Sequence, residues 1–325
     1  MNSLSIKKFA RQEDIARNIL FVDGITRCGK SLLSHVIGTF EEVEHIQFIN
    51  PLEHLVAGVS LGFVDIDFAR AFLSSHMNEA VYNTLLGRNI NFRYNDQTGV
   101  PNHPRFNMYQ DRLNYEDGDH IVEELRETSS LFPFMTHDMM VNFSVLRDLQ
   151  VKFKMLEIYR NPITNIQSCI NRGWGERFGA DPRAFTLNLR DGSALVPWYA
   201  AGQEDTWSTL NQTERCVWMV TTLLRRSINQ QRQHNDVNVL TFSFEDFVQN
   251  TSSTISKIET FLQRKKTPFT DQYLAKANCP RILDLSDINE IMRNIQRETR
   301  KDLYIDLEQL VEEYNDNVFG FCGQD

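Results

Sequence analysis

The feature that most constrains this chain is a glycine-rich turn near its amino terminus. The turn follows an apolar run at Ile19–Val22, reads Gly24-x-x-x-x-Gly29-Lys30-Ser31, and is followed by an apolar helical pattern. Glycines let successive backbone N–H groups point into one concavity, the next helix presents its positive end there, and a lysine adds a full charge. The pattern therefore predicts a strand, a phosphate-binding loop and a helix.

Length and charge limit the class of protein. The chain has 325 residues, of which 41% are hydrophobic, so it can bury a large core, and we expect one domain over residues 1–325. Its 43 acidic and 34 basic residues give a net charge of −9. A general DNA- or RNA-binding protein needs an excess of Lys and Arg to neutralise phosphates. We therefore expect no nucleic-acid partner.

Cysteine usage and hydropathy favour a cytoplasmic protein. The five cysteines are widely separated and form no C-x-x-C pair, so the sequence indicates neither a disulfide framework nor a zinc site, and we expect no metal. No apolar segment follows the basic residues Lys7, Lys8 and Arg11, and no stretch of about 18 apolar residues occurs. We therefore expect neither secretion nor a membrane span.

Five short runs rich in β-branched and aromatic residues predict the strands of a central sheet. They are Ile19–Asp23, His45–Ile49, Leu131–Thr136, Phe153–Tyr159 and Val237–Phe242. Helical patterns separate the runs, and strands that alternate with helices form parallel sheets covered on both faces. The expected fold is an α/β domain with a mostly five-stranded parallel sheet, like that of P-loop nucleotide-binding proteins, and a helical C-terminal part.

Ligands of such sheets collect at the carboxyl ends of the strands. The residues just after each predicted strand are therefore the candidates for a functional site. They are Arg27–Ser31, His137, Arg160 and Phe244–Asp246.

The remaining segments are predicted from local composition and periodicity. Residues 88–120 and 173–205 are rich in loop-forming and aromatic residues, so we expect long ordered loops, or a lid, that contact substrate. An apolar stripe predicts one long helix from Thr206 to Gln233. The pattern after this helix and the last strand is helical nearly to the end of the chain, with Ser252 or Ser253 as an N-cap.

A phosphate-binding loop serves several classes of enzyme, so a second site has to distinguish between them. A kinase or ATPase usually places an Asp at the end of an apolar strand as a magnesium ligand. The run Phe153–Tyr159 ends instead in Arg160, which is followed by Asn161-Pro162 and, eight positions after the arginine, by Ser168. An arginine at a strand end and a serine about two helical turns later can converge on a further phosphate beside an adenosine.

These motifs resemble those of the sulfotransferases that use 3′-phosphoadenosine 5′-phosphosulfate (PAPS). In that family a loop of the form Lys/Arg-Ser-Gly-Thr-Thr holds the 5′-phosphosulfate, and Arg27-Cys28-Gly29-Lys30-Ser31 lies in the same place after the first strand. The family's Arg-Asn-Pro segment and a following Ser hold the 3′-phosphate, and Arg160, Asn161, Pro162 and Ser168 match them in type and spacing.

Two further segments strengthen the resemblance. Phe244-Glu245-Asp246 is similar to a Tyr-Glu-Asp segment of the family, and Met135-Thr136-His137 is similar to the Lys-Thr-His of many cytosolic members, so the matched motifs cover residues 19–262. The chain departs from the family where Lys30 stands in place of a usual Thr and where Met135 replaces Lys. The glycine-rich basic motif near the C-terminus of cytosolic members is also missing.

The resemblance implies in-line transfer of a sulfuryl group from PAPS to a hydroxyl or amine, with adenosine 3′,5′-bisphosphate as the leaving product and no metal. Lys30 and Arg27 would stabilise charge on the leaving phosphate, and His137 would remove the acceptor's proton as a general base. The residues expected to bind the donor are Arg27, Cys28, Gly29, Lys30, Ser31, Leu32, Arg160 and Ser168.

Several residue assignments stay open at this point. The alternative bases are His103, His76 and Asp138. The basic residue that completes the 3′-phosphate site is one of Arg172, Arg177, Arg264–Lys266 and Arg281. The aromatic side chain that stacks on adenine is one of Trp174, Trp198, Phe242 and Phe244. Glu245 and Asp246 are expected to be structural.

Two other functions also fit the sequence. An ATP- or GTP-dependent small-molecule kinase would use the complete Gly-x-x-x-x-Gly-Lys-Ser loop and would tolerate Arg160→Ala, and a noncatalytic binding protein would bind nucleotide without transferring any group. A negatively charged protein is a poor partner for polyanionic glycosaminoglycans, so we expect a small-molecule acceptor, and the acidic balance is compatible with a cationic metabolite. The sequence does not indicate the oligomeric state.

Overall fold

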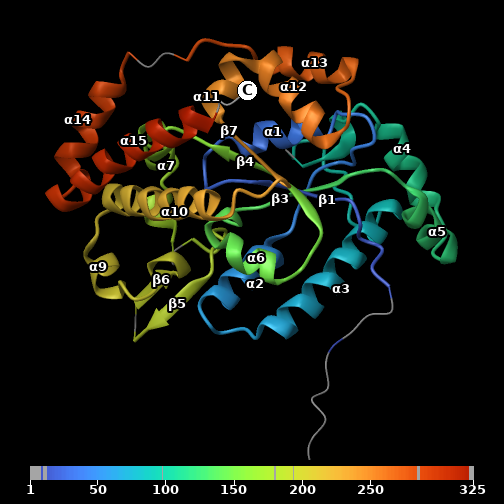
Figure 1. The fold of residues 1–325 in the computed structure, drawn as a ribbon, viewed down its shortest axis with the longest axis horizontal. Coiled ribbons are helices and arrows are strands. Elements are labelled where there is room, and N and C mark those ends of the chain that lie inside the picture. The colour runs from blue at the N-terminus through green and yellow to red at the C-terminus, as the bar shows by residue number, and fades with distance from the viewer. Residues whose placement is uncertain are drawn as a thin grey trace, which may run out of the picture.

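A five-stranded parallel sheet lies at the centre of the protein (Figure 1). The computed structural model describes residue 9 and residues 13–96, 98–178, 181–192, 194–283 and 286–321. The strand order is β2-β3-β1-β4-β7, and every neighbouring pair is parallel, so the carboxyl ends of the strands share one edge. The bounds are β1 Ile19–Asp23, β2 Gln47–Phe48, β3 Phe132–Met135, β4 Phe153–Tyr159 and β7 Val239–Ser243.

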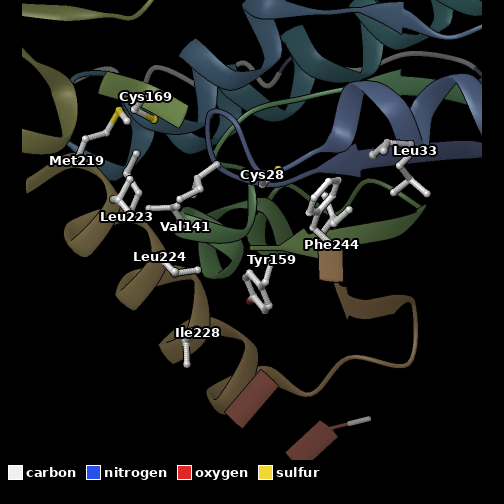
Figure 2. Close-up of a cluster of buried hydrophobic side chains, with 14 of the residues drawn as sticks. Cys28, Leu33, Val141, Tyr159, Cys169, Met219, Leu223, Leu224, Ile228 and Phe244 are labelled. Atoms are coloured by element: carbon white, nitrogen blue, oxygen red, sulfur yellow. The ribbon is translucent and has the colours of Figure 1, made fainter. Parts of the chain in front are cut away.

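The two faces of the sheet bury different hydrophobic clusters, because side chains alternate along each strand. Leu20 and Val22 of β1 join one cluster, and Ile19 and Phe21 join the other. The helices over the first cluster, part of which Figure 2 shows, are α1 (Lys30–Ile37), α7 (Pro162–Ile170), α10 (Gln212–His234), α12 (Thr251–Leu262) and α15 (Lys301–Phe321). The helices over the second are α2 (Asn50–Ser60), α3 (Ile66–Leu85), α5 (Asp119–Glu127) and α6 (Phe143–Asp148).

The sheet confirms the fold class predicted from the sequence. β1 and β4 have the predicted bounds, and both lie in the interior of the sheet with a partner on each side. β2 is reduced to Gln47–Phe48 within the predicted run, at an edge where only β3 pairs with it. β3, which is also interior, is one residue shorter at each end than predicted, and β7 begins at Val239 and ends at Ser243 instead of spanning Val237–Phe242.

The two segments expected to be long loops contain short elements of their own. The first is anchored by a buried ion pair in which Arg112 Nη1 and Nη2 donate to the Glu44 carboxylate at 2.8 and 2.9 Å, and the second contains an antiparallel pair, β5–β6. The elements are η1 (Val100–Asn102), α4 (Phe106–Asp111), η2 (Arg112–Asn114), α8 (Trp174–Arg177), β5 (Asn188–Asp191), β6 (Ala194–Pro197), η4 (Trp198–Ala200) and α9 (Glu204–Thr209).

The prediction of one helix from Thr206 to Gln233 is wrong. α9 ends before Leu210, whose backbone is extended, and α10 begins after Asn211. The Asn211 side chain accepts from Glu214 N, and the Glu214 side chain accepts from Asn211 N, so a capping box starts the second helix. The stripe of apolar residues continues across the break between the two helices, so hydrophobic periodicity alone does not indicate the break.

The C-terminal part is helical, as predicted, but its cap was misplaced. Asn250 precedes the first residue of α12, so the proposal of Ser252 or Ser253 as an N-cap is wrong, and both serines lie in the first turn. The helices not yet given are η3 (Met140–Asn142), α11 (Phe244–Gln249), α13 (Pro268–Lys276) and α14 (Ile288–Glu298). Among the described residues, no helix has both the length and the apolar character that crossing a membrane requires.

Candidate active site

The glycine-rich loop joins β1 to α1 at the carboxyl edge of the sheet. Gly24, Arg27 and Gly29 have φ angles of +145°, +68° and +109°, in the region that favours glycine. A Cβ atom at Gly29 would lie 2.3 Å from Cδ2 of Phe244, whose ring packs against the loop. Position 29 therefore admits only glycine, and the backbone forms an open turn at the positive end of α1.

Lys30 lies beneath this loop and is only 5% exposed. Its ammonium donates to the carbonyl oxygen of Gly24 at 2.5 Å and to that of Ile25 at 3.1 Å. These two bonds use two of the three ammonium donors and hold a positive charge directly under the turn. Cys28 points into the first hydrophobic cluster, and its burial raises the pKa of the thiol to about 11, so its side chain packs as a neutral group.

The Arg-Asn-Pro segment at the end of β4 is in direct contact with the glycine-rich loop. Arg160 Nη1 donates to the carbonyl oxygen of Arg27 at 3.0 Å, and Arg27 Nε donates to Ser168 Oγ at 3.1 Å. The Arg160 side chain is also held by Thr164, whose Oγ1 accepts from Nε at 3.0 Å. Asn161 caps α7 by accepting from two backbone N–H groups. The structure therefore brings together the two sequence motifs expected to bind anions.

A third arginine approaches the same place. The guanidinium carbon of Arg160 lies 5.0 Å from the ring centre of Phe244, and that of Arg281 lies 5.7 Å from it. Arg281 is thus the basic residue, among those left open by the sequence, that the structure places at this ring. Arg177 and Lys266 are instead paired with Asp181 and Asp271.

Glu245 has the structural role expected of it. One carboxylate oxygen accepts from the backbone N–H of Asn161 at 3.1 Å, and the other accepts from the hydroxyl of Tyr314 at 3.0 Å. The side chain therefore ties the turn after β4 to the helix α15. Of the candidate adenine-stacking residues, Phe244 lies at the arginine cluster, Phe242 is buried in the first hydrophobic cluster, and Trp174 and Trp198 line a different cavity.

His137 stands at the end of β3, held by a carboxylate from α2. Its backbone N–H donates to Glu53 Oε1 at 2.7 Å, and its Nδ1 lies 3.0 Å from the same oxygen. The preceding Thr136 donates to Asp23 Oδ1 at 2.8 Å, and the backbone N–H of Met140 donates to Asp23 Oδ2 at 2.9 Å. Asp23 therefore fixes the turn that carries His137.

Desolvation shifts the ionisation of the groups around His137. It lowers the pKa of His137 to about 3, with the charge of Lys30 acting in the same direction, so the imidazole is neutral at pH 7. Desolvation also raises the pKa of Glu53 to about 8 and that of Asp138 to about 7. The neutral imidazole has a free lone pair at Nε2, but a pKa of about 3 makes it a weak proton acceptor, and a negative charge on Glu53 beside Nδ1 is what would raise its basicity toward that of a general base.

A cavity of about 400 Å³ opens beside His137, and we name it the His137 cavity. Thr26 of the glycine-rich loop forms part of its wall, so the cavity and the loop share a boundary. Its lining residues are Thr26, Phe48, Asn50, Glu53, His54, His137, Asp138, Asn142, Trp174, Arg183, Phe185, Thr186, Leu187 and Trp198. Of the two segments predicted to contact substrate, 173–205 lines this cavity together with residues at the sheet edge, and no residue of 88–120 is among the lining residues.

Other candidates from the sequence lie elsewhere. His103 lines a second cavity of about 380 Å³ together with Ser31 and Leu32, and His76 lines a third. Asp138, the remaining alternative base, lies in the His137 cavity itself. Among the described residues no group of three or more His, Cys, Asp or Glu side chains is arranged to hold a metal ion.

The sequence did not reveal the role of Glu53. This residue lies in the first turn of α2, 84 positions before His137, and it resembles an ordinary acidic residue near a helix N-terminus. Its position after the predicted strand His45–Ile49 was the available signal, because residues that follow parallel strands meet at one edge.

Most of the chain matches one protein family. A family model described as a sulfotransferase domain matches residues 19–279. No curated protein matches the chain. Among solved structures, the sulfotransferase domain from the Synechococcus PCC 7002 olefin synthase is 14% identical over 95% of this chain and 98% of that chain, with a TM-score of 0.45. A sulfotransferase from Alicyclobacillus acidocaldarius is 12% identical over 91% and 96%, with a TM-score of 0.40.

Proposed function

The chain belongs to the sulfotransferase domain family, and from that premise we propose that it transfers a sulfuryl group from PAPS to a hydroxyl or amine of a small molecule. The observation that carries the proposal is the direct contact between two anion-binding motifs, through Arg160–Arg27 and Arg27–Ser168 hydrogen bonds. PAPS has two phosphate groups on one adenosine, and when bound it supplies the activated sulfuryl group. Two joined anion sites suit such a donor better than a single phosphate-binding loop does.

The glycine-rich loop would hold the 5′ end of the donor. Gly29 gives the loop a left-handed backbone angle beside the Phe244 ring, and Ser31 lies in the first turn of α1. Lys30 and Arg27 place positive charge where the leaving phosphate gains negative charge, and fixed cations in such a position lower the barrier. Cys28 would contribute only through its backbone, since its side chain is buried.

The arginine cluster would hold the 3′-phosphate. Arg160 uses two of its five N–H donors on Arg27 and Thr164, so its guanidinium has donors left for a phosphate oxygen. Ser168 lies one hydrogen bond from Arg27, and Arg281 approaches the same aromatic ring as Arg160. We therefore assign Arg281 to the role that the missing C-terminal basic motif plays in the family.

His137 would act as the general base. The acceptor's hydroxyl or amine would lie in the His137 cavity, give its proton to Nε2 as it attacks sulfur, and form the new bond to sulfur as the bond to the 5′-phosphate breaks. Glu53 would fix the ring through its contact with Nδ1 and stabilise the imidazolium that forms. We also place the reaction in the cytoplasm, a proposal supported by the four described cysteines, which are free and buried.

The kinase alternative is supported by one observation, the complete Gly-x-x-x-x-Gly-Lys-Ser loop. A kinase also needs an acidic side chain for magnesium beside the loop. Asp23 is the acidic residue at the end of β1. Its Oδ1 accepts a hydrogen bond from Thr136, and its Oδ2 accepts one from Met140. This arrangement gives Asp23 a structural role, and the contacts of Arg27 with Arg160 and Ser168, which a kinase does not require, favour the sulfotransferase proposal.

Mass spectrometry would test the proposed function directly. The protein is incubated with PAPS and a soluble metabolite extract, and products heavier by one SO₃ are sought together with adenosine 3′,5′-bisphosphate. We expect such products with the wild type, and a decrease with His137→Ala. A parallel reaction with ATP and magnesium serves as the comparison. Phosphorylated products there, with no sulfated product from PAPS, would overturn the proposal in favour of a kinase.

A further inference from the structure

The His137 cavity contains a carboxylate that the protein leaves without a partner. Asp138 lies in its wall, and its Oδ1 atom is buried and accepts no hydrogen bond from any described residue. The described ion pairs include none to Asp138. An unsatisfied buried carboxylate is costly, because burial removes the water that would otherwise stabilise its charge. Asp138 as a whole is partly exposed and lines the cavity, so a bound group with N–H donors would meet its carboxyl group from the cavity side.

The charges of Lys30 and Arg226 act on Asp138, but the hydrogen bonds of both side chains go to other groups. Lys30 donates to the carbonyls of Gly24 and Ile25, and Arg226 donates to Asn142 Oδ1 at 2.9 Å while its charge is still felt by Asp138. Arg183, which lines the cavity, makes two hydrogen bonds to the Asp181 carboxylate at 2.9 and 3.1 Å.

The second carboxylate of the cavity is Glu53, whose described partners are the backbone N–H and the ring of His137. Its neighbour His54 directs Nε2 to the carbonyl oxygen of Phe185 at 2.7 Å. The cavity thus has two carboxyl groups, and its lining arginine is neutralised by an aspartate outside the cavity.

Part of the cavity wall is aromatic and apolar. Phe48 and Phe185 line it with side chains that are 46% and 67% exposed, so they offer apolar surface to a bound molecule. Trp174 and Trp198 line it as well, and each has an arginine against its ring, Arg177 at 4.1 Å and Arg226 at 5.4 Å. A ligand that fits both kinds of wall has an apolar part and a group that carries N–H donors.

We propose that the acceptor is a small amphipathic amine, whose protonated amino group binds Asp138 and whose apolar part packs against Phe48 and Phe185. The hydroxyl that receives the sulfuryl group then lies toward His137, the residue next to Asp138. This proposal rests on the proposed function for the identity of the reaction. Its recognition chemistry depends only on the cavity.

The test compares amines with neutral molecules of the same shape. The probes are phenylalaninol and 2-methyl-3-phenylpropan-1-ol, and tyramine and 4-propylphenol, in which a methyl group replaces the ammonium. Each is titrated by calorimetry into wild-type protein saturated with adenosine 3′,5′-bisphosphate, so that no transfer occurs. We expect the amine of at least one pair to bind roughly 10- to 100-fold more tightly than its neutral counterpart, as a charge-assisted hydrogen bond would provide.

Two variants locate the effect. Asp138→Asn keeps the side-chain shape and, because Asn tolerates the left-handed backbone of residue 138 at φ +60°, keeps the backbone. We expect it to reduce the amine's affinity to that of the neutral probe and to leave the neutral probe unchanged. Asp271→Asn, at a position that does not line the cavity, is the matched control and should leave both affinities as they are.

The outcomes separate this proposal from the proposed function. Equal binding of amines and neutral probes, no measurable amine binding, or an amine preference that survives in a folded Asp138→Asn protein overturns the amine proposal. The wild-type comparison decides the matter even if the variant does not fold. Failure of adenosine 3′,5′-bisphosphate to bind counts against the proposed function instead, and the amine pairs are then compared on the unliganded protein.

Discussion

Arg160 offers the sharpest test of how the donor is held. Its Nε and Nη1 atoms donate to Thr164 and to the Arg27 carbonyl, and three N–H donors remain for a phosphate. Each charge-assisted hydrogen bond contributes about 1.5 to 3 kcal/mol, so the loss of two such bonds would weaken binding by at least about 3 kcal/mol. For Arg160→Ala we therefore expect roughly a 150-fold increase in the Kd for adenosine 3′,5′-bisphosphate.

Calorimetric titration measures this change and separates it from a folding defect. ADP lacks the 3′-phosphate, so its Kd should change far less, and Arg160→Lys should fall between the wild type and Arg160→Ala because a point charge cannot reproduce the paired donors. Arg297→Ala, at an exposed position on α14, is the matched control. An Arg160→Ala protein that binds adenosine 3′,5′-bisphosphate within about threefold of the wild type would refute this reasoning.

Four other predictions concern the loop, the base, the carboxyl group beside the base and a buried acid. Gly29→Ala should weaken the binding of adenosine 3′,5′-bisphosphate, measured by calorimetry, more than 100-fold, because the added Cβ strains the loop by roughly 3 kcal/mol. The control Gly62→Ala, at φ +75° with open space around it, should leave the affinity unchanged. His137→Ala should lower kcat roughly 10²- to 10⁴-fold with donor affinity intact. The kcat/KM of the wild type should rise through about pH 8 as Glu53 ionises, and a profile that keeps this limb in Glu53→Gln would contradict the assignment. Burial raises the pKa of Glu157 well above its ordinary 4.5, so the folded state keeps the proton and the free energy of unfolding should fall as pH rises above 4.5. In Glu157→Gln, the free energy of unfolding measured in urea should depend less on pH between pH 5 and 8. An unchanged dependence would count against a buried, protonated Glu157.

The parts of the fold that the sequence predicts are those set by local chemistry. Ile19–Asp23 is buried throughout and Phe153–Tyr159 over its last five residues, and the β-branched and aromatic residues of these runs give the bounds of β1 and β4. The turn at Gly24 and Gly29 needs backbone angles that few other residues adopt, and this requirement is visible in the sequence. The break before α10 was missed although Asn211 and Glu214 form a readable capping box, because the apolar stripe continues across it.

The parts of the candidate site that sequence cannot assign depend on tertiary contacts. Glu53 reaches His137 only because β2 and β3 are neighbours in the sheet, and nothing local to α2 indicates this contact. The sequence alone does not distinguish Arg281 from the other basic candidates. The structure does, because the segment after α13 packs so that Arg281 lies against Phe244. The role of Asp138 depends on which groups near it are already paired.

The central claim is that one adenosine bridges the glycine-rich loop and the arginine cluster. The most direct measurement is a side-by-side calorimetric titration of the wild-type protein with adenosine 3′,5′-bisphosphate and with ADP, each with and without magnesium. We expect the bisphosphate to bind at least about tenfold more tightly than ADP, through its additional phosphate, and to do so without magnesium. Tighter binding of ADP, dependent on magnesium, would contradict the account.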